Sequence, residues 1–284
     1  MKVFLACLGL LLLTSVGYSR QSTMEVSLAY LKADESMDIE QMRPFYADSI
    51  RFEDPTGEVF QTSTGGMVVV GRDSLLKLQA SWGLDASEFE VDRSFSVGPF
   101  AVHNGVYHVA VPGMDDRVHI PFVTFHEIRE GKLVSRMDFG EYIESFGLGN
   151  QFDAQTQATQ RVARHYLAAY TGKDFDTQEA LLAEDAVFQD PTAQTLGPSW
   201  GQVQETASVI MQRRRTNHPS LLQFSFDITS SFFASRHAVF VGNVSYTVSS
   251  GQTFVQPAVF VFEVHDGRVV RHWDFVDYSV PALP

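Results

Sequence analysis

The stretch RFEDPT at residues 51–56 decides the fold, because a variant of it, VFQDPT, recurs at residues 187–192. The two stretches are 136 residues apart, and the same offset aligns the surrounding sequence without gaps. Residues 30–56 and 166–192 share 9 of 27 positions, and residues 121–142 and 257–278 share 8 of 22. A constant offset at both ends of a unit indicates an internal duplication.

The length of the chain agrees with this duplication. Its 284 residues are long for one domain and sufficient for two of about 120–140 residues each. We expect domain 1 at residues 23–148 and domain 2 at residues 158–284. The polar segment 149–157 is expected to be a linker that leads into the next helix.

The N-terminus has the pattern of a secretory signal peptide. Lys2 is followed by an apolar run at residues 3–13, and small residues precede a cleavage position after residue 19. We therefore expect a secreted or periplasmic protein with no membrane segment after cleavage. The single cysteine, Cys7, lies in this segment, so the mature chain has no disulfide and no catalytic thiolate.

The formal net charge of −13 disfavours two classes of partner. Nucleic acid and anionic membrane surfaces would both repel an acidic protein that lacks a basic stripe. We expect neither as a partner.

Each unit is expected to open with helices and to end in strands. Apolar residues at helical spacing predict helices at 24–35, 39–46 and 73–82 in domain 1, and at 159–170, 175–183 and 199–215 in domain 2. Alternating apolar residues predict strands at 89–97, 101–111, 118–128 and 132–142, and at 222–233, 238–248, 253–264 and 268–278. This order predicts an α+β fold in which helices cover one face of a curved antiparallel sheet.

The helix, helix, strand and Asp-Pro order resembles the SnoaL-like and ketosteroid isomerase-like domains of the nuclear transport factor 2-like superfamily. That resemblance implies two tandem cone-shaped domains, each with about three helices on the concave face of its sheet. It also implies that Asp54 and Asp190 are catalytic bases. Tyr30 and Tyr166, each 24 residues before its Asp, would be oxyanion donors. A carboxylate facing an apolar surface can have the raised pKa that such a base needs.

Two further pairs of residues are candidates for the pockets. The ketosteroid isomerase family has a second oxyanion donor, an Asp two residues after a Pro, and here Val123 and Val259 occupy that place. Losing one oxyanion donor lowers a rate on the order of 10²–10³-fold. The stretch around Asp138, with Asp274 as its counterpart, resembles limonene epoxide hydrolase, where an Asp helps to activate water. That family also uses an Arg and a second Asp on the neighbouring strand, which residues 106–108 and 243–245 do not supply.

Structural interpretations of these residues remain open from the sequence alone. Asp-Pro is a common turn, Tyr on a first helix is often a core residue, and an Asp on a last strand can bond a neighbouring element. The His residues are not at metal-ligand spacing, and the nucleotide and phosphate-loop fingerprints are absent, so no metal or cofactor is expected.

Three functions fit these patterns. The first is an enzyme that moves a proton on a small apolar carbonyl compound, as isomerases, cyclases and dehydratases do. The second is a non-catalytic module that binds a small hydrophobic molecule or a protein. The third is structural, with one copy supplying the sheet that pairs with the other in an intramolecular pseudo-dimer. Because one fold hosts all three, the geometry of the site must decide.

Overall fold

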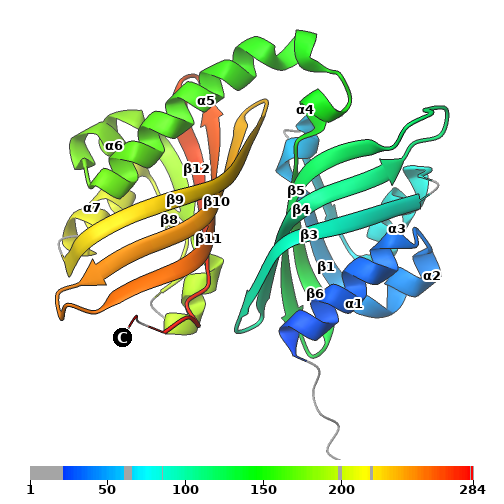
Figure 1. Ribbon diagram of the computed structural model, residues 1–284, viewed down its shortest axis with the longest axis horizontal. Coiled ribbons are helices and arrows are strands. Elements are labelled where there is room, and N and C mark those ends of the chain that lie inside the picture. The colour runs from blue at the N-terminus through cyan, green and yellow to red at the C-terminus, as the bar shows by residue number, and fades with distance from the viewer. Residues whose placement is uncertain are drawn as a thin grey trace, which may run out of the picture.

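The computed structural model describes residues 22–60, 66–84, 86–197, 200–217, 220–281 and 283. Two six-stranded sheets lie face to face, and most helices cover their outer sides (Figure 1). The expected α+β fold with two tandem domains is confirmed. The expected signal peptide, residues 1–19, lies outside the described residues. Within the described ranges, no helix is long and apolar enough to cross a membrane.

Domain 1 contains one sheet with strands in the order β2-β1-β6-β5-β4-β3. Helix α1 packs on β3, β4 and β5, and α3 packs on β1 and β2. The elements are α1 (Thr23–Glu35), α2 (Ile39–Met42), η1 (Arg43–Phe45), β1 (Tyr46–Asp54), η2 (Pro55–Val59), β2 (Met67–Val70), α3 (Arg72–Ser81), β3 (Ala86–Val97), β4 (Phe100–Ala110), β5 (Val118–Arg129), β6 (Lys132–Gly140) and α4 (Tyr142–Ser145).

Domain 2 repeats this arrangement in the order β8-β7-β12-β11-β10-β9. Its elements are α5 (Gly149–Gly172), α6 (Phe175–Leu181), β7 (Leu182–Gln189), η3 (Pro191–Leu196), β8 (Gln204–Glu205), α7 (Ala207–Asn217), β9 (Leu221–Ala234), β10 (His237–Val248), β11 (Thr253–His265) and β12 (Arg268–Val276). The sequence did not predict the short strands β2 and β8, which pair with β1 and β7.

The strand pairing brings both ends of each unit together. Strands β3 to β6 form the expected antiparallel meander, and so do β9 to β12. Strand β1 then pairs in parallel with β6, with Phe52 beside Arg136, and β7 pairs in parallel with β12, with Phe188 beside His272. This parallel pairing places the two Asp-Pro motifs at one end of their sheets, next to the final strands.

A glycine permits a bulge in each sheet. The β3–β4 register shifts between Val91 and Arg93, opposite Gly105, and the β9–β10 register shifts next to Gly242. A Cβ at either glycine would overlap a backbone carbonyl oxygen of the neighbouring strand. Bulges increase the local twist of a sheet, so these glycines favour the curvature that the fold requires.

Helices α5 and α7 differ from the predicted ranges. Residues 149–157, the expected linker, form the first turns of α5, since residues 150–171 contain no Gly or Pro and include several good helix formers. Helix α7 was expected to begin at residue 199 but begins at Ala207. Gly201 has φ +70° and Thr206 has φ +73°, and such residues cannot belong to a right-handed helix.

The inner faces of the two sheets share one apolar core. Phe125 and Phe275 pack with ring centroids 4.6 Å apart, and Phe139 meets Trp273 edge-on at 5.8 Å. At the margin, Nη1 of Arg93 donates to the backbone carbonyl of Gly242 at 3.0 Å. The buried members of this interdomain core are Phe95, Phe100, Val102, Val123, Phe125, Phe139, Val239, Val241, Val259, Val261, Trp273 and Phe275. One copy therefore covers the apolar sheet face of the other.

Candidate functional site

The two motif aspartates occupy equivalent places in the two domains. Asp54 caps the N-terminus of η2 and Asp190 that of η3. Oδ1 of Asp54 accepts from the Thr56 hydroxyl at 2.8 Å and from the Gly57 amide at 2.9 Å. Oδ1 of Asp190 accepts from the Thr192 hydroxyl at 2.7 Å and from the Ala193 amide at 3.0 Å. The Asp-Pro turn is therefore real, and it holds one oxygen of each carboxyl fixed.

The second oxygen of each carboxyl accepts from a tyrosine that the sequence analysis did not single out. Tyr142 donates to Oδ2 of Asp54 at 2.7 Å, and Tyr278 donates to Oδ2 of Asp190 at 2.6 Å. Both tyrosines follow a final strand and are half-buried. Because the same residue type occurs at both positions 136 residues apart, the repeat could have indicated that these tyrosines matter.

Burial raises the pKa of both carboxyls above the usual value of an aspartate. Desolvation is the largest cause, and the nearby charge of Asp138 adds to it, so the pKa of Asp54 is raised to about 6. Desolvation and the charge of Asp274 raise the pKa of Asp190 to about 7. The tyrosine, threonine and amide donors oppose this rise because they stabilise the ionised form.

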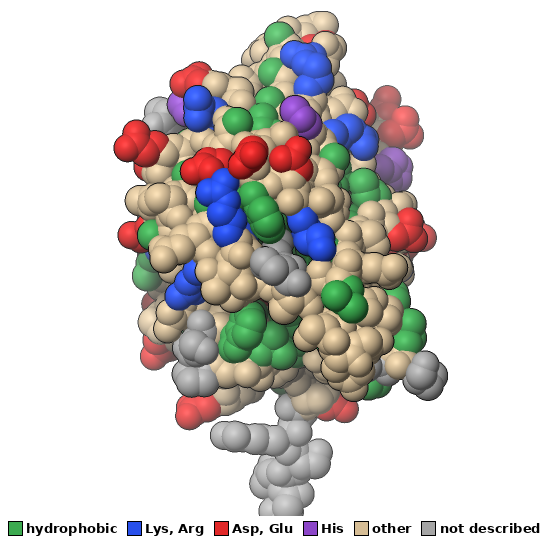
Figure 2. All heavy atoms as spheres, turned by 90° about the vertical axis from the view of Figure 1, so that its left-hand side faces the viewer, with side chains coloured by type: hydrophobic (Ala, Val, Ile, Leu, Met, Phe, Trp, Pro, Cys, Tyr) green, Lys and Arg blue, Asp and Glu red, His purple; other side chains and the backbone are tan. Residues whose placement is uncertain are grey.

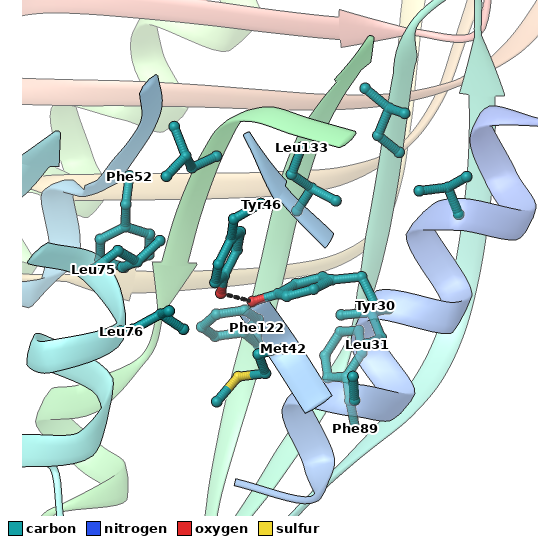
Figure 3. Packing of buried hydrophobic residues seen from close by; sticks show 14 of the residues in the cluster. Tyr30, Leu31, Met42, Tyr46, Phe52, Leu75, Leu76, Phe89, Phe122 and Leu133 are labelled. Atoms are coloured by element: carbon teal, nitrogen blue, oxygen red, sulfur yellow. Dashed lines mark hydrogen bonds between the residues drawn. The ribbon is translucent and has the colours of Figure 1, made fainter. Parts of the chain in front are cut away.

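Tyr30 and Asp54 are not joined by a hydrogen bond. The Tyr30 hydroxyl is fully buried, lies 2.6 Å from the Tyr46 hydroxyl and donates to Oδ1 of Asp34 at 3.1 Å. Figure 3 shows the two tyrosines meeting among the apolar side chains of domain 1. Desolvation raises the pKa of Tyr30 well above its usual value. This hydroxyl is thus part of the packed interior of domain 1.

Arg136 connects Tyr30 with two carboxylates. It donates to the Tyr30 hydroxyl, lies 3.3 Å from Oδ1 of Asp34 and contacts Oδ2 of Asp138 at 2.7 Å. All three charged side chains are at most 4% exposed as residues. An Arg and a second Asp therefore accompany Asp138. They lie on β6 itself and on α1 rather than at residues 106–108, which belong to β4.

Domain 2 builds the corresponding centre from different residues. The buried guanidinium belongs to Arg214 of α7, whose Nη1 donates to the Tyr166 hydroxyl at 2.7 Å and to Oε1 of Gln178 at 2.9 Å. Its Nη2 lies 2.9 Å from Nδ1 of His272. The strand position of Arg136 is taken by His272, and that of Asp34 by Tyr170.

These contacts fix the tautomer of His272. A guanidinium can only donate, so Nδ1 accepts from Arg214 and the proton lies on Nε2. Nε2 then donates to Oδ1 of Asp274 at 2.5 Å, and the Tyr170 hydroxyl donates to Oδ2 of Asp274 at 3.0 Å. Desolvation lowers the pKa of His272 below its usual value, against the effect of Asp274. A neutral imidazole therefore links the guanidinium to the carboxylate.

A cavity of about 580 Å³ opens beside this centre in domain 2. Asp190, Asp274, Tyr170, Tyr278 and Arg214 line it together with apolar side chains. Tyr166 is fully buried and does not line it. The apolar and aromatic lining comprises Phe188, Ala193, Leu196, Trp200, Leu221, Phe224, Val244, Tyr246, Val248, Phe260 and Val276. The cavity thus combines a polar wall with an apolar body, as small-molecule sites do.

Val123 and Val259, the expected pocket residues, do not line the cavity of domain 2, and both are buried in the interdomain core. Strand side chains alternate between faces, so Val123 and Val259 point to the opposite sheet while Phe122 and Phe260 point to the helices. Among the described residues, no group of three or more His, Cys, Asp or Glu side chains is arranged to hold a metal ion.

Several solved structures resemble part of this chain. A putative SnoaL-like polyketide cyclase from Shewanella denitrificans OS-217 is 23% identical, with a TM-score of 0.39 over 43% of this chain and 92% of its own. A putative isomerase from Bacillus subtilis is 22% identical, with a TM-score of 0.38 over 43% and 88%. An LEH-like epoxide hydrolase of M. tuberculosis is 20% identical, with a TM-score of 0.38 over 44% and 86%. No curated protein matches the sequence.

The family comparison covers most of both domains. The model of the SnoaL-like domain matches residues 28–136 and again residues 163–272. These ranges contain both Asp-Pro motifs, both first-helix tyrosines and most of both sheets. The chain therefore belongs to the SnoaL-like domain family, of which it carries two tandem copies.

Proposed function

We propose that domain 2 catalyses proton transfer, of the isomerase, cyclase or dehydratase type, on a small and largely apolar carbonyl compound. One observation carries this proposal. Asp190 lies in the wall of the cavity, and its pKa is raised to about 7 by burial and by Asp274. A general base is most effective when its pKa lies near the working pH.

The chemistry requires only the groups that line the cavity. The carboxylate of Asp190 removes a proton from the carbon next to the carbonyl, so that a C–H bond breaks and an enolate forms. Protonated Asp190 then returns the proton to another carbon of the same compound, which completes an isomerisation. Thr192 and Tyr278 hold the carboxyl in place during both steps. Fixed donors at the developing oxyanion stabilise such an enolate in a water-poor site.

Arg214 supports the enolate in this proposal. It lines the cavity and is 5% exposed, so little solvent screens its charge. Arg214 takes the role for which the sequence had suggested Tyr166, since the single hydroxyl proton of Tyr170 already goes to Asp274. Tyr166 lies behind Arg214 and positions its guanidinium.

Domain 1 is assigned a supporting role. Its carboxylates Asp34 and Asp138 are paired with Arg136, and Asp54 is 2% exposed among its bonding partners. The interdomain core shows that domain 1 covers the apolar sheet face of domain 2. The apolar run at residues 3–13 supports the further proposal that the protein acts outside the cytoplasm.

Exchange of hydrogen for deuterium next to a carbonyl tests the reaction class directly. The full chain is incubated in deuterated buffer with a panel of enolisable ketones, and exchange is followed by NMR. Asp190→Asn should lower the exchange rate by at least about 10²-fold, because a positioned base contributes that much or more. Asp54→Asn, the matched change in domain 1, should leave the rate within about twofold. Exchange that Asp190→Asn does not slow would refute Asp190 as the base.

A ligand measurement distinguishes catalysis from binding alone. Small molecules that copurify with the native protein are identified by mass spectrometry, and their affinities for wild type and Asp190→Asn are compared. Equal affinity together with an absence of exchange in both proteins would favour the non-catalytic binding module.

A further inference from the structure

Two neighbouring arginines line the cavity without an ion pair. Among the residues that the structure describes, no carboxylate lies within 4 Å of Arg213 or Arg214 in an ion pair, whereas the next residue, Arg215, contacts Asp176 at 3.1 Å and Glu179 at 2.8 Å. The contrast is informative because the chain has 34 acidic residues against 21 basic ones. The absence of an ion pair at these two arginines of the cavity wall is therefore notable in so acidic a chain.

In domain 1, the guanidinium that occupies the equivalent place is paired with two carboxylates. Arg136 is held there between Asp34 and Asp138. In domain 2 the place of Asp34 is taken by Tyr170, and Arg214 has only neutral partners at hydrogen-bond distance. A buried charge without an opposite charge is unfavourable, so such a group is commonly found where a ligand supplies the missing charge. The nearest carboxylate to Arg214, Asp274, is thus reached only through His272, whereas domain 1 pairs its guanidinium directly with carboxylates.

The exposure of the lining residues gives the cavity a direction. Asp190, Phe260 and Asp274 are buried and mark its closed end. Trp200 is 50% exposed and lies at the open end, where its neighbours Gln202 and Asn217 are also exposed. Figure 2 looks onto this side of the molecule, where hydrophobic side chains lie beside Lys and Arg side chains.

Arg213 belongs to the open end. It is half-buried, and its Nη2 donates to Oε1 of Gln202 at 3.4 Å, a long and weak bond. A guanidinium offers five donors in a planar fork that matches a carboxylate. Most of the donors of Arg213 are therefore left for a ligand that enters the cavity.

We propose that the cavity of domain 2 takes an anionic amphipathic ligand, whose carboxylate binds Arg213 at the mouth while its apolar body fills the cavity. The carbonyl end of the same molecule would then reach Asp190, and this part rests on the proposed function. Arg213 is a specificity residue in this arrangement, since it selects keto acids over uncharged ketones.

Two fluorescent probes that differ by one anionic group test the proposal on the full chain. They are 1-anilinonaphthalene-8-sulfonate, whose sulfonate stands in for the carboxylate, and the uncharged N-phenyl-1-naphthylamine. Wild type should bind the sulfonate at least tenfold more tightly, because a charge-assisted bond is worth at least one decade in affinity. Arg213→Gln should remove this preference and leave the uncharged probe within about twofold.

Arg215→Gln is the matched control, since it removes a guanidinium from the same helix that already has two carboxylate partners. It should change neither affinity. Equal affinity of wild type for the two probes, a loss of both probes in Arg213→Gln, or an equal loss in Arg215→Gln would each overturn the proposal, and so would absence of any binding. Failure of the deuterium exchange assay alone would overturn catalysis by Asp190 and leave the anion preference standing.

Discussion

The two domains share a fold and differ in what fills it. Domain 1 has a hydrogen-bonded polar network between α1 and its sheet, and domain 2 has aromatic and small apolar side chains at the same places. At the 136-residue offset, Ser27, Thr124 and His126 in domain 1 correspond to Ala163, Phe260 and Phe262 in domain 2. His103, which pairs with Thr124, corresponds to Phe240, which pairs with Phe260. All eight side chains are buried. Topology therefore fixes where the interior lies, while side-chain chemistry decides whether it becomes a salt-linked core or a cavity.

The buried guanidinium illustrates the same difference. It comes from strand β6 in domain 1 and from helix α7 in domain 2, yet in both cases it donates to the tyrosine of the first helix. Domain 1 surrounds it with carboxylates, whereas domain 2 leaves it at a cavity wall. Removing each guanidinium in turn can therefore show whether it stabilises its domain or serves the cavity.

The largest effect is expected from removing each guanidinium. Arg136→Met leaves Asp34 and Asp138 buried without a cation, and breaking a buried pair in this way costs about 3–5 kcal/mol. Arg214→Met leaves only neutral partners, so its cost should be nearer the ~1–3 kcal/mol of unmade hydrogen bonds. Urea unfolding, followed by far-UV circular dichroism, measures the cost of each change.

Restoring neutrality provides the control for this comparison. A double change of Asp34→Asn with Arg136→Met should recover part of the loss, because one unpaired carboxylate is removed. Equal costs for Arg136→Met and Arg214→Met would contradict the view that only domain 1 uses its guanidinium for stability.

The next effect concerns pH. The pKa of folded Asp190 is about 7 and that of Asp54 about 6, against about 3.9 for an unfolded Asp. Between these values the folded state binds a proton that the unfolded state has lost, so stability falls as pH rises. For Asp190 this fall is on the order of 3–4 kcal/mol and extends from about pH 4 to 7. For Asp54 it is on the order of 3 kcal/mol and ends near pH 6.

Asparagine variants isolate each contribution. Relative to wild type, the stability of Asp190→Asn should rise from pH 4 to about pH 7 and then stay constant, and that of Asp54→Asn should rise only up to about pH 6. Free energies of unfolding at pH 4, 6 and 8 distinguish the two. If both variants behaved alike above pH 6, the difference in environment between the two carboxyls would be contradicted.

A smaller effect is expected where the domains touch. Gly98, in the β3–β4 turn, has φ +56°, and a Cβ there would press on Cγ2 of Thr195 in η3, the turn that follows Asp190. Gly131 has φ +74° with no atom within 4 Å of its Cβ position, so it supplies a matched control. Gly131→Ala should cost about 1 kcal/mol from backbone strain alone.

Gly98→Ala should cost about 1 kcal/mol more and should also shift the titration of Asp190, measured by NMR of a ¹³C-labelled carboxyl. This result would show that domain 1 positions the site turn of domain 2. A titration of Asp190 that Gly98→Ala leaves unmoved would argue that the two domains are independent.

The sequence revealed the fold because the duplication is visible as a constant offset, and because helix and strand periods are local properties. It could not reveal the parallel pairing of β1 with β6, which joins distant segments, or strands as short as β8. Asp54 and Asp190 were predicted as site residues from the resemblance that their Asp-Pro motif carries. Arg136 and Arg214 were missed, since they do not align with each other and charged residues are usually exposed. Val123 was misplaced because sequence alone left open which face of its strand meets the helices.

The smallest effect is a protonation pattern, and it is specific to domain 1. The Thr124 hydroxyl donates to Oδ1 of Asp138 at 2.6 Å, so its oxygen must accept from Nε2 of His126 at 3.0 Å. Nδ1 of His126 then accepts from the Ser27 hydroxyl at 2.6 Å. The Ser27 oxygen in turn accepts from Nε2 of His103, also at 2.6 Å. The carboxylate thereby orders every proton along the chain.

Both histidines should therefore be neutral with the proton on Nε2. Burial lowers the pKa of His103 to about 4, and it lowers the pKa of His126 well below its usual value. ¹⁵N NMR should show no titration of either ring between pH 5 and 8, and Asp138→Asn should scramble the tautomers because an amide can donate as well as accept. The matched change in domain 2, Asp274→Asn, should leave both rings unchanged, since phenylalanines interrupt any such chain there. A His126 that titrated near pH 6.5 would contradict a sealed, fully paired interior in domain 1.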